Sequence, residues 1–175
     1  MFFSVRELEI RKAPFSVELQ PGKIDFVEGL RQLTPICADG AAELASSSLG
    51  EIRVRGKFAV RMAADCDRCL APAEYPIDER FDLSYWPTTP GRPGEERHLD
   101  EDEADIGFYE GKGLDLEDVL RERIILALPM QRVCRADCKG FCPVCGQNRN
   151  LADCGCREKA ADDRWAALKQ IDNEK

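Results

Sequence analysis

Hydrophobic and polar residues alternate most clearly over residues 52–62. The apolar positions have the period of two that is typical of a half-buried strand, and they are Ile52, Val54, Phe58, Val60 and Met62. Gly56 interrupts the run at a point where a β-bulge would fit. The alternation returns at Tyr75, Ile77, Phe81, Leu83 and Tyr85. Only a short turn at 66–69 separates the two runs, so they predict an antiparallel hairpin with that turn at its tip.

Weaker alternation predicts further strands over residues 2–10, 15–19, 24–28 and 106–109. Residues 34–49 are small and polar and support no prediction. Residues 87–103 are rich in proline, glycine and acidic side chains without any period, so we expect a mobile loop there.

Apolar residues at helical spacing predict a helix over about 115–128. They are Leu116, Val119, Leu120, Ile124 and Leu128, with Ile125 and Leu126 widening the apolar stripe. Asp115 is suited to cap this helix, and Pro129 ends it. A second helix is predicted over 159–171, with Trp165, Leu168 and Ile171 on one face.

Together these elements predict an α+β protein with a mainly antiparallel sheet that could curl into a barrel-like form. A long helix, a cysteine-rich segment and a C-terminal helix complete it. The length of 175 residues suits one principal domain. We divide the chain into a sheet domain, residues 1–129, and a cysteine-rich segment with the C-terminal helix, residues 130–175, packed on the first part.

The net charge of −8 argues against a general nucleic-acid coat, which is usually basic. The charge is uneven, however, because residues 95–105 are strongly acidic while residues 130–150 are mostly basic. The basic residues of that second stretch are candidate contacts to RNA phosphates, namely Arg132, Arg135, Lys139 and Arg149. Arg53, Arg55, Lys57 and Arg61 on the long strand could extend this surface or form an ordinary solvated face.

Eight of the nine cysteines occur in four close pairs, which are Cys66 and Cys69, Cys134 and Cys138, Cys142 and Cys145, and Cys154 and Cys156. Eight thiolates suffice for two tetrahedral four-cysteine zinc sites of the structural kind. No stretch approaches about 18 consecutive apolar residues, so we expect a cytoplasmic protein without a membrane partner. In that compartment clustered cysteines are more often metal ligands than disulfides.

The sequence leaves the assignment of cysteines to sites open. We favour one site from the last four cysteines, a compact local set containing the Cys-Pro-Val-Cys-Gly turn, and a second that joins the hairpin tip to Cys134 and Cys138. An alternative groups Cys134, Cys138, Cys142 and Cys145, leaving the other four. A third has a single zinc ion with Cys66 and Cys69 as free thiols. Iron–sulfur ligation fits less well, because the spacings match neither ferredoxin pattern.

Nothing in the chain predicts catalysis. A zinc ion held by four cysteines has no open position for an activating water. His98, the only histidine, lies in the acidic stretch and is interpreted as a solvated side chain. Cys37 is interpreted as a buried small apolar residue. We therefore expect neither an enzyme nor a small-molecule substrate.

Four ordered motifs resemble the YceD-like family of large-subunit ribosomal RNA accumulation proteins. They are Cys66-Asp-Arg-Cys69-Leu70, Ile125-Leu-Ala-Leu-Pro-Met130, Cys138-Lys-Gly-Phe-Cys-Pro-Val-Cys-Gly-Gln-Asn148 and Arg164-Trp-Ala-Ala-Leu-Lys169. The resemblance implies a non-enzymatic role in ribosomal RNA accumulation and ribosome biogenesis, with precursor ribosomal RNA, a large-subunit ribosomal protein, or both as partners. The rival hypothesis is a zinc-stabilised protein–protein adaptor without RNA contact.

Overall fold

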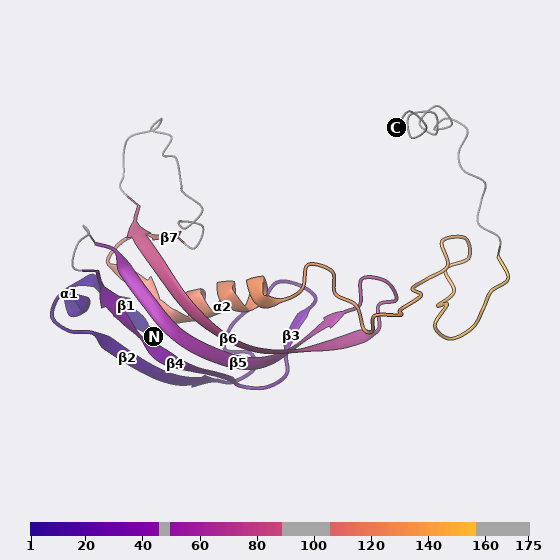
Figure 1. Ribbon diagram of the computed structural model, residues 1–175, viewed down its shortest axis with the longest axis horizontal. Coiled ribbons are helices and arrows are strands. Elements are labelled where there is room, and N and C mark those ends of the chain that lie inside the picture. Colours follow the sequence, from indigo (N-terminus) through magenta and orange to yellow (C-terminus); the bar gives the residue numbers. More distant parts are fainter. Residues whose placement is uncertain (46–49, 89–105, 157–175) are drawn as a thin grey trace, which may run out of the picture.

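The computed structural model describes residues 1–45, 50–88 and 106–156. A curved six-stranded sheet forms most of the structure and a helix lies against it (Figure 1). The strands are β1 (Phe2–Ser4), β2 (Ala13–Leu19), β3 (Leu30–Gln32), β4 (Ile36–Leu44), β5 (Ile52–Asp65), β6 (Pro72–Pro87), β7 (Ile106–Tyr109) and β8 (Gly113–Asp115). The helices are α1 (Val5–Leu8) and α2 (Leu116–Ala127).

The predicted hairpin is present as β5 and β6, which pair antiparallel from Ile52 opposite Tyr85 to Asp65 opposite Pro72. The alternation is also confirmed, because Ile52, Val54, Phe58, Val60 and Met62 are all buried. The cysteine turn lies at the tip, at the end of the hairpin that is far from β7 (Figure 1).

Gly56 does not form a bulge. The register runs unbroken through it on both sides, opposite Gly40 of β4 and Phe81 of β6. A Cβ atom on Gly40 would lie 2.6 Å from the ring of Phe15, and one on Gly56 would lie 3.2 Å from it. The two facing glycines therefore make room for an aromatic ring over the middle of the sheet.

The order of the sheet is β2-β4-β5-β6-β7, with β3 beside β5. All pairs are antiparallel except β6 with β7. The sheet curves but is not a closed barrel, because β2 and β7 form its two outer ends in the described part of the chain. The barrel-like expectation is therefore wrong, whereas the α+β class with a mainly antiparallel sheet is correct.

Two strand predictions need correction, and one strand was not predicted. The first predicted strand ends at Ser4, and α1 begins at Val5. Residues 24–28 are not a strand, although Ile24 is buried in the core. Residues 36–44, for which the sequence supported no prediction, form β4, the strand that joins β2 to the hairpin.

Helix α2 packs against the inner face of the sheet through Leu116, Val119, Leu120 and Ile124, all of which are buried. Asp115 caps it as predicted, since its side chain accepts a hydrogen bond of 2.9 Å from the backbone N–H of Glu117. The helix has 12 residues, which is average rather than long. Leu126 is 65% exposed, so the apolar stripe is narrower than expected on that side.

The predicted helix over 159–171, most of the predicted loop over 87–103 and His98 lie outside the described residues. Within the described ranges, no helix has the length and apolar character needed to cross a membrane.

Candidate metal centres

The turn at the hairpin tip is held by three hydrogen bonds that aim sulfur atoms inward. The backbone N–H of Leu70 donates to the carbonyl of Cys66 at 2.9 Å, and the N–H of Cys66 donates to the carbonyl of Ala71 at 2.9 Å. The N–H of Arg68 points at Cys66 Sγ at 3.4 Å. Leu70 takes a left-handed backbone conformation with φ of 56° to close the turn.

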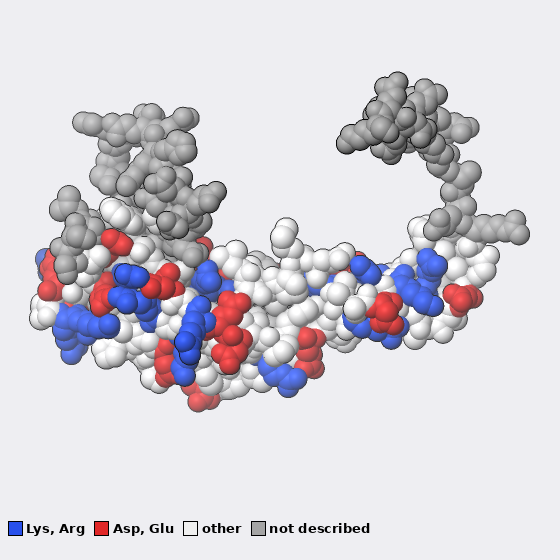
Figure 2. Space-filling model, viewed as in Figure 1, with Lys and Arg blue, Asp and Glu red and all other residues white. Residues whose placement is uncertain are grey.

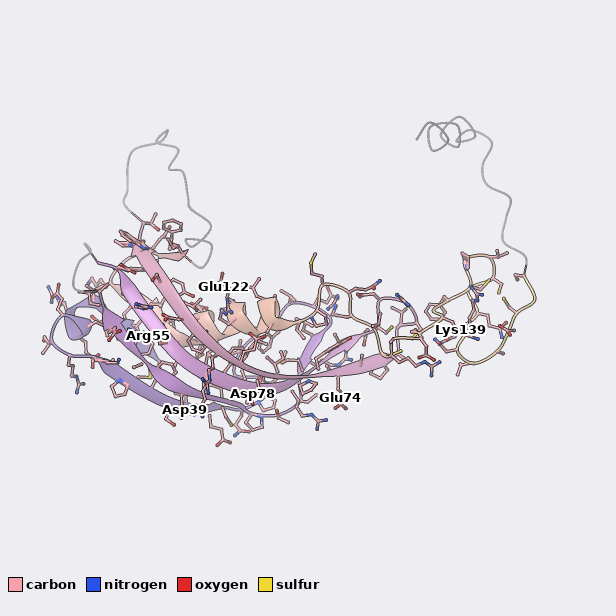
Figure 3. All side chains as sticks on the ribbon, in the orientation of Figure 1. Asp39, Arg55, Glu74, Asp78, Glu122 and Lys139 are labelled. Atoms are coloured by element: carbon pink, nitrogen blue, oxygen red, sulfur yellow. The ribbon has the colours of Figure 1, made fainter. Side chains whose placement is uncertain are left out.

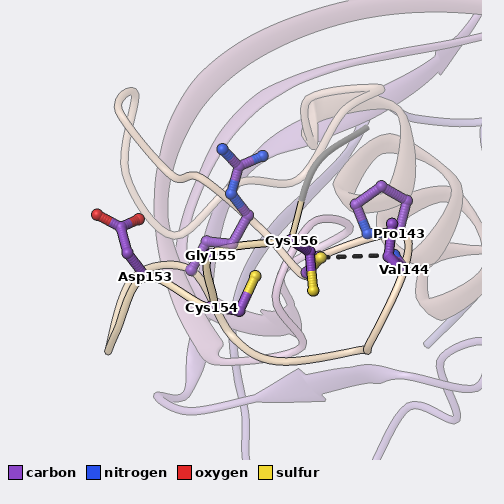
Figure 4. A pocket seen from close by; sticks show the side chains of 8 residues that line it. Pro143, Val144, Asp153, Cys154, Gly155 and Cys156 are labelled. Carbon is purple, nitrogen blue, oxygen red and sulfur yellow. Dashed lines mark hydrogen bonds between the residues drawn. The ribbon is translucent and has the colours of Figure 1, made fainter. Parts of the chain in front are cut away.

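The Cys142–Cys145 turn repeats this arrangement. The N–H of Gly146 donates to the carbonyl of Cys142 at 2.9 Å. The N–H of Val144 points at Cys142 Sγ at 3.4 Å (Figure 4). Gly146 has a φ of 74°, the counterpart of Leu70 in the first turn. Two unrelated stretches of sequence therefore form the same thiol-presenting turn, the backbone conformation that suits metal-binding cysteine pairs.

Four sulfur atoms converge at the first centre. Cys66, Cys69, Cys134 and Cys138 have all their Sγ atoms within 4.8 Å of one another. Cys66 Sγ lies 3.9 Å from Cys138 Sγ, and Cys69 Sγ lies 3.6 Å from Cys134 Sγ. A tetrahedral zinc ion with Zn–S bonds of about 2.3 Å requires S···S edges of about 3.8 Å. The geometry therefore fits a zinc ion at this point.

The first centre is buried in its own small core. Cys66, Cys69 and Cys138 are at most 4% exposed, and Ala71 and Val133 pack against them. This core is separate from the main core between the sheet and α2. Because few apolar residues contribute, a bound ion would supply much of the stability of this end of the molecule.

Backbone contacts bring the segment after α2 to the hairpin tip. Asp67 and Arg132 exchange two hydrogen bonds, from the Asp67 N–H to the Arg132 carbonyl at 2.7 Å and from the Arg132 N–H to the Asp67 carboxylate at 2.6 Å. Tyr75 of β6 donates to the carbonyl of Val133 at 3.3 Å. Further along, the N–H of Phe141 donates to the carbonyl of Arg68 at 3.0 Å. Sequence-distant cysteines meet because of these contacts.

The second centre consists of Cys142, Cys145, Cys154 and Cys156, whose Sγ atoms also lie within 4.8 Å of one another. It is more open, since Cys145 and Cys156 are exposed. Three of its cysteines line a hollow of about 210 Å³ together with Pro143, Val144, Arg149, Asp153 and Gly155 (Figure 4). The structure thus groups the eight cysteines in the way that we favour from the sequence.

One thiol in each cysteine turn is predisposed to ionise. Burial opposes ionisation of Cys66, but the surrounding hydrogen bonds, led by the backbone N–H of Arg68, outweigh it and lower the pKa of Cys66 to about 6. Backbone N–H groups of Cys145 and Val144 lower the pKa of Cys142 to about 6. Burial and the neighbouring thiols raise the pKa of Cys134. Each centre therefore offers a first thiolate to an incoming cation, which then promotes ionisation of the others.

Cys37 lies in neither centre. It is exposed on β4, which corrects the expectation of a buried position. All nine cysteines are free thiols.

Asn150 supports the first centre from outside its ligand set, and sequence reasoning missed it. Its side-chain amide Nδ2 lies 3.4 Å from Cys138 Sγ of the first centre. Its Oδ1 accepts hydrogen bonds of 2.9 Å from the N–H of Lys139 and the guanidinium of Arg135. The only signal was a pair of short amide residues, Asn148 and Asn150, following the Cys-Pro-Val-Cys-Gly turn.

The four predicted RNA-contacting cations divide into two kinds. Arg132 pairs with Asp67 at 3.6 Å, and Arg135 pairs with Asp137 at 3.3 Å. Lys139 and Arg149 are exposed, and neither forms an ion pair with any described residue. Lys139 lies beyond the hairpin tip, in the cysteine-rich end of the molecule (Figure 3).

The arginines of β5 are ion-paired on the outer face of the sheet. Arg53 forms two 2.7 Å hydrogen bonds with Asp82, Arg55 pairs with Glu43, and Arg61 lies 3.0 Å from Glu74. Positive and negative side chains accordingly intermix over the strands (Figure 2). Arg55, Asp39, Asp78 and Glu74 are distributed along this face (Figure 3). These pairs favour the interpretation of an ordinary solvated face.

Residues 54–172 match the family described as large ribosomal RNA subunit accumulation protein YceD. The match covers well over half of the chain and includes both cysteine clusters, so the chain belongs to this family.

The relatives are bacterial proteins of uncharacterized function. Proteins of Mycobacterium tuberculosis and Mycobacterium bovis are 31% identical over 121 residues, covering 69% of this chain and 55% of theirs. The protein YlbN of Bacillus subtilis is 23% identical over 146 residues, covering 81% of this chain and 77% of its own. The matched region thus spans little more than half the length of the mycobacterial relatives. No solved structure matches significantly.

Proposed function

We propose that this protein is a non-enzymatic factor in large-subunit ribosomal RNA accumulation, and so in ribosome biogenesis. The family membership carries the biological role. The lack of catalysis is inferred from the two centres, each of which supplies four thiols and would leave a zinc ion without an open coordination position. Zinc would act here as a structural clamp.

The proposed contact to precursor ribosomal RNA is through the cysteine-rich segment. The observation that supports it is the exposure of Lys139 and Arg149 without ion pairs among the described residues, in contrast to the paired arginines of β5. Phe141 and Val144 beside them are 40% and 45% exposed. Cations interleaved with apolar side chains suit single-stranded RNA, whose backbone binds the cations and whose bases contact the apolar groups.

The second candidate is an adaptor that binds a large-subunit ribosomal protein without touching RNA. Two observations favour it. Arg132 and Arg135 are already paired with aspartates. In addition, each zinc ion with four thiolates would carry a net charge of about −2, which offsets the nearby cations.

The test is salt-dependent binding of precursor ribosomal RNA by the full chain, compared with a variant in which Arg132, Arg135, Lys139 and Arg149 become glutamate. RNA contact predicts that this variant loses binding while retaining its metal. Each lost phosphate contact should flatten the slope of log affinity against log salt by about 0.7 for a single strand. The matched control changes Arg53, Arg55 and Arg61 to glutamate. No RNA binding by the wild type, with recovery of a ribosomal protein in pull-downs, would support the adaptor.

A further inference from the structure

Three adjoining hollows follow one side of α2. They measure about 400, 70 and 310 Å³, and Glu122 lines all three. Asp118, Glu122 and Leu126 succeed one another at intervals of four residues, so they lie on one face of the helix. That face extends over about 12 Å, enough for roughly four residues of an extended peptide. The three hollows together are called the α2 groove below.

The largest hollow of the α2 groove is aromatic. Its floor is formed by buried Tyr85, Tyr109, Leu114 and Val119. Phe2 of β1 and Phe108 of β7 stand at its edge and are 53% and 66% exposed. Two exposed phenyl rings beside a hollow with an apolar floor are typical of a binding surface rather than of scattered surface residues.

Every charged residue that lines this largest hollow is acidic, namely Glu110, Asp115, Asp118 and Glu122. Asp115 caps α2 and pairs with the N-terminal amino group at 3.5 Å, and Asp118 pairs with Arg121. Glu110 is exposed and forms no ion pair with any described residue. Glu122 lies beside the phenol of Tyr85. Burial first and this carboxylate second raise the pKa of the phenol, while the nearby Arg123 cation partly opposes them. A cation would therefore gain an electrostatic partner here, whereas a phosphate would be repelled.

Arginine and lysine match this combination. Their aliphatic stems pack on apolar surface while the charged ends reach carboxylates. Their cations also bind the faces of aromatic rings. Two cations line the smaller hollows. Arg121 lines the 310 Å³ hollow and pairs with Asp118, and Arg123 lines the 70 Å³ hollow.

We infer that the α2 groove binds a lysine- and arginine-rich segment of a partner protein, with Phe2, Phe108, Glu110 and Glu122 as its principal contacts. Proteins that bind RNA carry such segments to neutralise phosphates. The inference is independent of the proposed RNA contact, because Glu122 and Lys139 lie well apart along the long axis of the molecule (Figure 3). If both hold, one chain binds RNA at the cysteine-rich end and a basic protein at the other.

The test is a fluorescence anisotropy titration of a labelled peptide of alternating arginine and glycine with the full chain. We expect saturable binding that weakens when salt is raised. Phe108→Ala should lower the affinity by about 3- to 30-fold, the range of a cation–π contact. Glu110→Lys replaces an attractive charge with a repulsive one and should also lower the affinity. Both side chains are exposed, so neither change should disturb the fold, which circular dichroism would check.

Two matched controls make the result specific. Asp78→Lys also replaces an acidic residue with lysine, but on the outer face of the sheet, and is the control for Glu110→Lys. Ile10→Ala truncates an apolar side chain that is 85% exposed outside the groove, and is the control for Phe108→Ala. Neither should alter the affinity. The inference is overturned if the wild type shows no saturable binding, if Phe108→Ala binds normally, or if Asp78→Lys weakens binding as much as Glu110→Lys. It is equally overturned if Phe108→Ala abolishes binding of single-stranded RNA, because the groove would then be a nucleic-acid site.

Discussion

The sulfur atoms of Cys69 and Cys134 lie 3.6 Å apart although 65 positions separate the two residues in the chain. The first belongs to the turn between β5 and β6, and the second follows α2. An ion held between them would fasten the end of the sheet to the segment that leads to the second centre. The cysteines thus link the stability of the hairpin tip to metal binding.

Metal content is the first prediction. Elemental analysis of protein purified without chelator should find two zinc ions per chain, because two four-cysteine clusters are present. Cys142→Ser should leave one ion. Cys37→Ser should leave both, since Cys37 lies outside the clusters. One ion in the wild type would show that only one cluster is a metal site, and none would refute the zinc assignment.

The two centres should also unfold separately. Cys142→Ser should remove protection from hydrogen exchange over residues 141–156 alone, because that centre is local in sequence. Cys66→Ser should instead loosen the hairpin tip and residues 131–138. Loss of one ligand forfeits several of the about 10 kcal/mol that a structural zinc site supplies to folding. Identical, global loss of protection in both variants would contradict two independent centres.

The sequence predicted the β5–β6 hairpin and α2 well because their patterns are local. Alternation over residues 52–62 and helical spacing after Asp115 depend only on which face is buried. Strand β4 escaped prediction because its residues are small. Gly40 leaves room for the ring of Phe15 on the neighbouring strand β2. The sequence around Gly40 does not reveal this requirement, because the two residues are far apart in the chain.

The candidate site was predictable from the sequence only where it depends on local spacing. Cysteine pairs have short-range spacing, so the turns at Cys66 and Cys142 could be inferred. The role of Asn150 could not, because its amide contacts Cys138 and Arg135 only after the chain has folded back. The α2 groove likewise combines side chains of β1, β7 and α2.

Asn150→Ala should loosen the first centre without removing a metal ligand. The change deletes hydrogen bonds to Cys138 Sγ, Lys139 and Arg135. We expect a loss of roughly 1–3 kcal/mol, because a thiolate would lose a donor. The rate of zinc release to a chelator should rise accordingly. Gln147→Ala, which shortens a nearby exposed side chain, is the control, and equal release rates in the two variants would refute the supporting role of Asn150 at the first centre.

Gly40→Ala should destabilise the sheet strongly. The added Cβ would lie 2.2 Å from the carbonyl oxygen of Arg55 and 2.6 Å from the ring of Phe15. The Arg55 carbonyl belongs to the backbone of β5, so relieving the clash would require the strand to shift. We expect the free energy of unfolding to fall by about 3 kcal/mol in denaturant titrations. Ala59→Ser, at an exposed position of β5, should change it by less than about 0.5 kcal/mol. A mild effect of Gly40→Ala would mean that the Arg55 carbonyl and the Phe15 ring do not lie this close to Gly40.

The ion pair of Asp82 with Arg53 should make stability depend on pH. Hydrogen bonding to Arg53 lowers the pKa of Asp82 below its ordinary value of 3.8. A carboxyl group whose pKa is lower in the folded state stabilises the fold above the unfolded pKa, and this stabilisation disappears as the pH falls through the folded pKa. Asp82→Asn should therefore be less stable than wild type at neutral pH, and the difference should shrink below about pH 4.

The comparison that isolates this effect is with Asp78→Asn on the same strand. Asp78 is exposed and pairs with no arginine among the described residues. Acid also protonates the cysteines and releases metal, but it does so equally in both variants, so the difference between their unfolding free energies reports on Asp82 alone. That difference should be small, because both partners of the Asp82–Arg53 pair are nearly half exposed. A difference that stays constant from neutral to strongly acidic pH would show that Asp82 contributes through packing rather than through its charge.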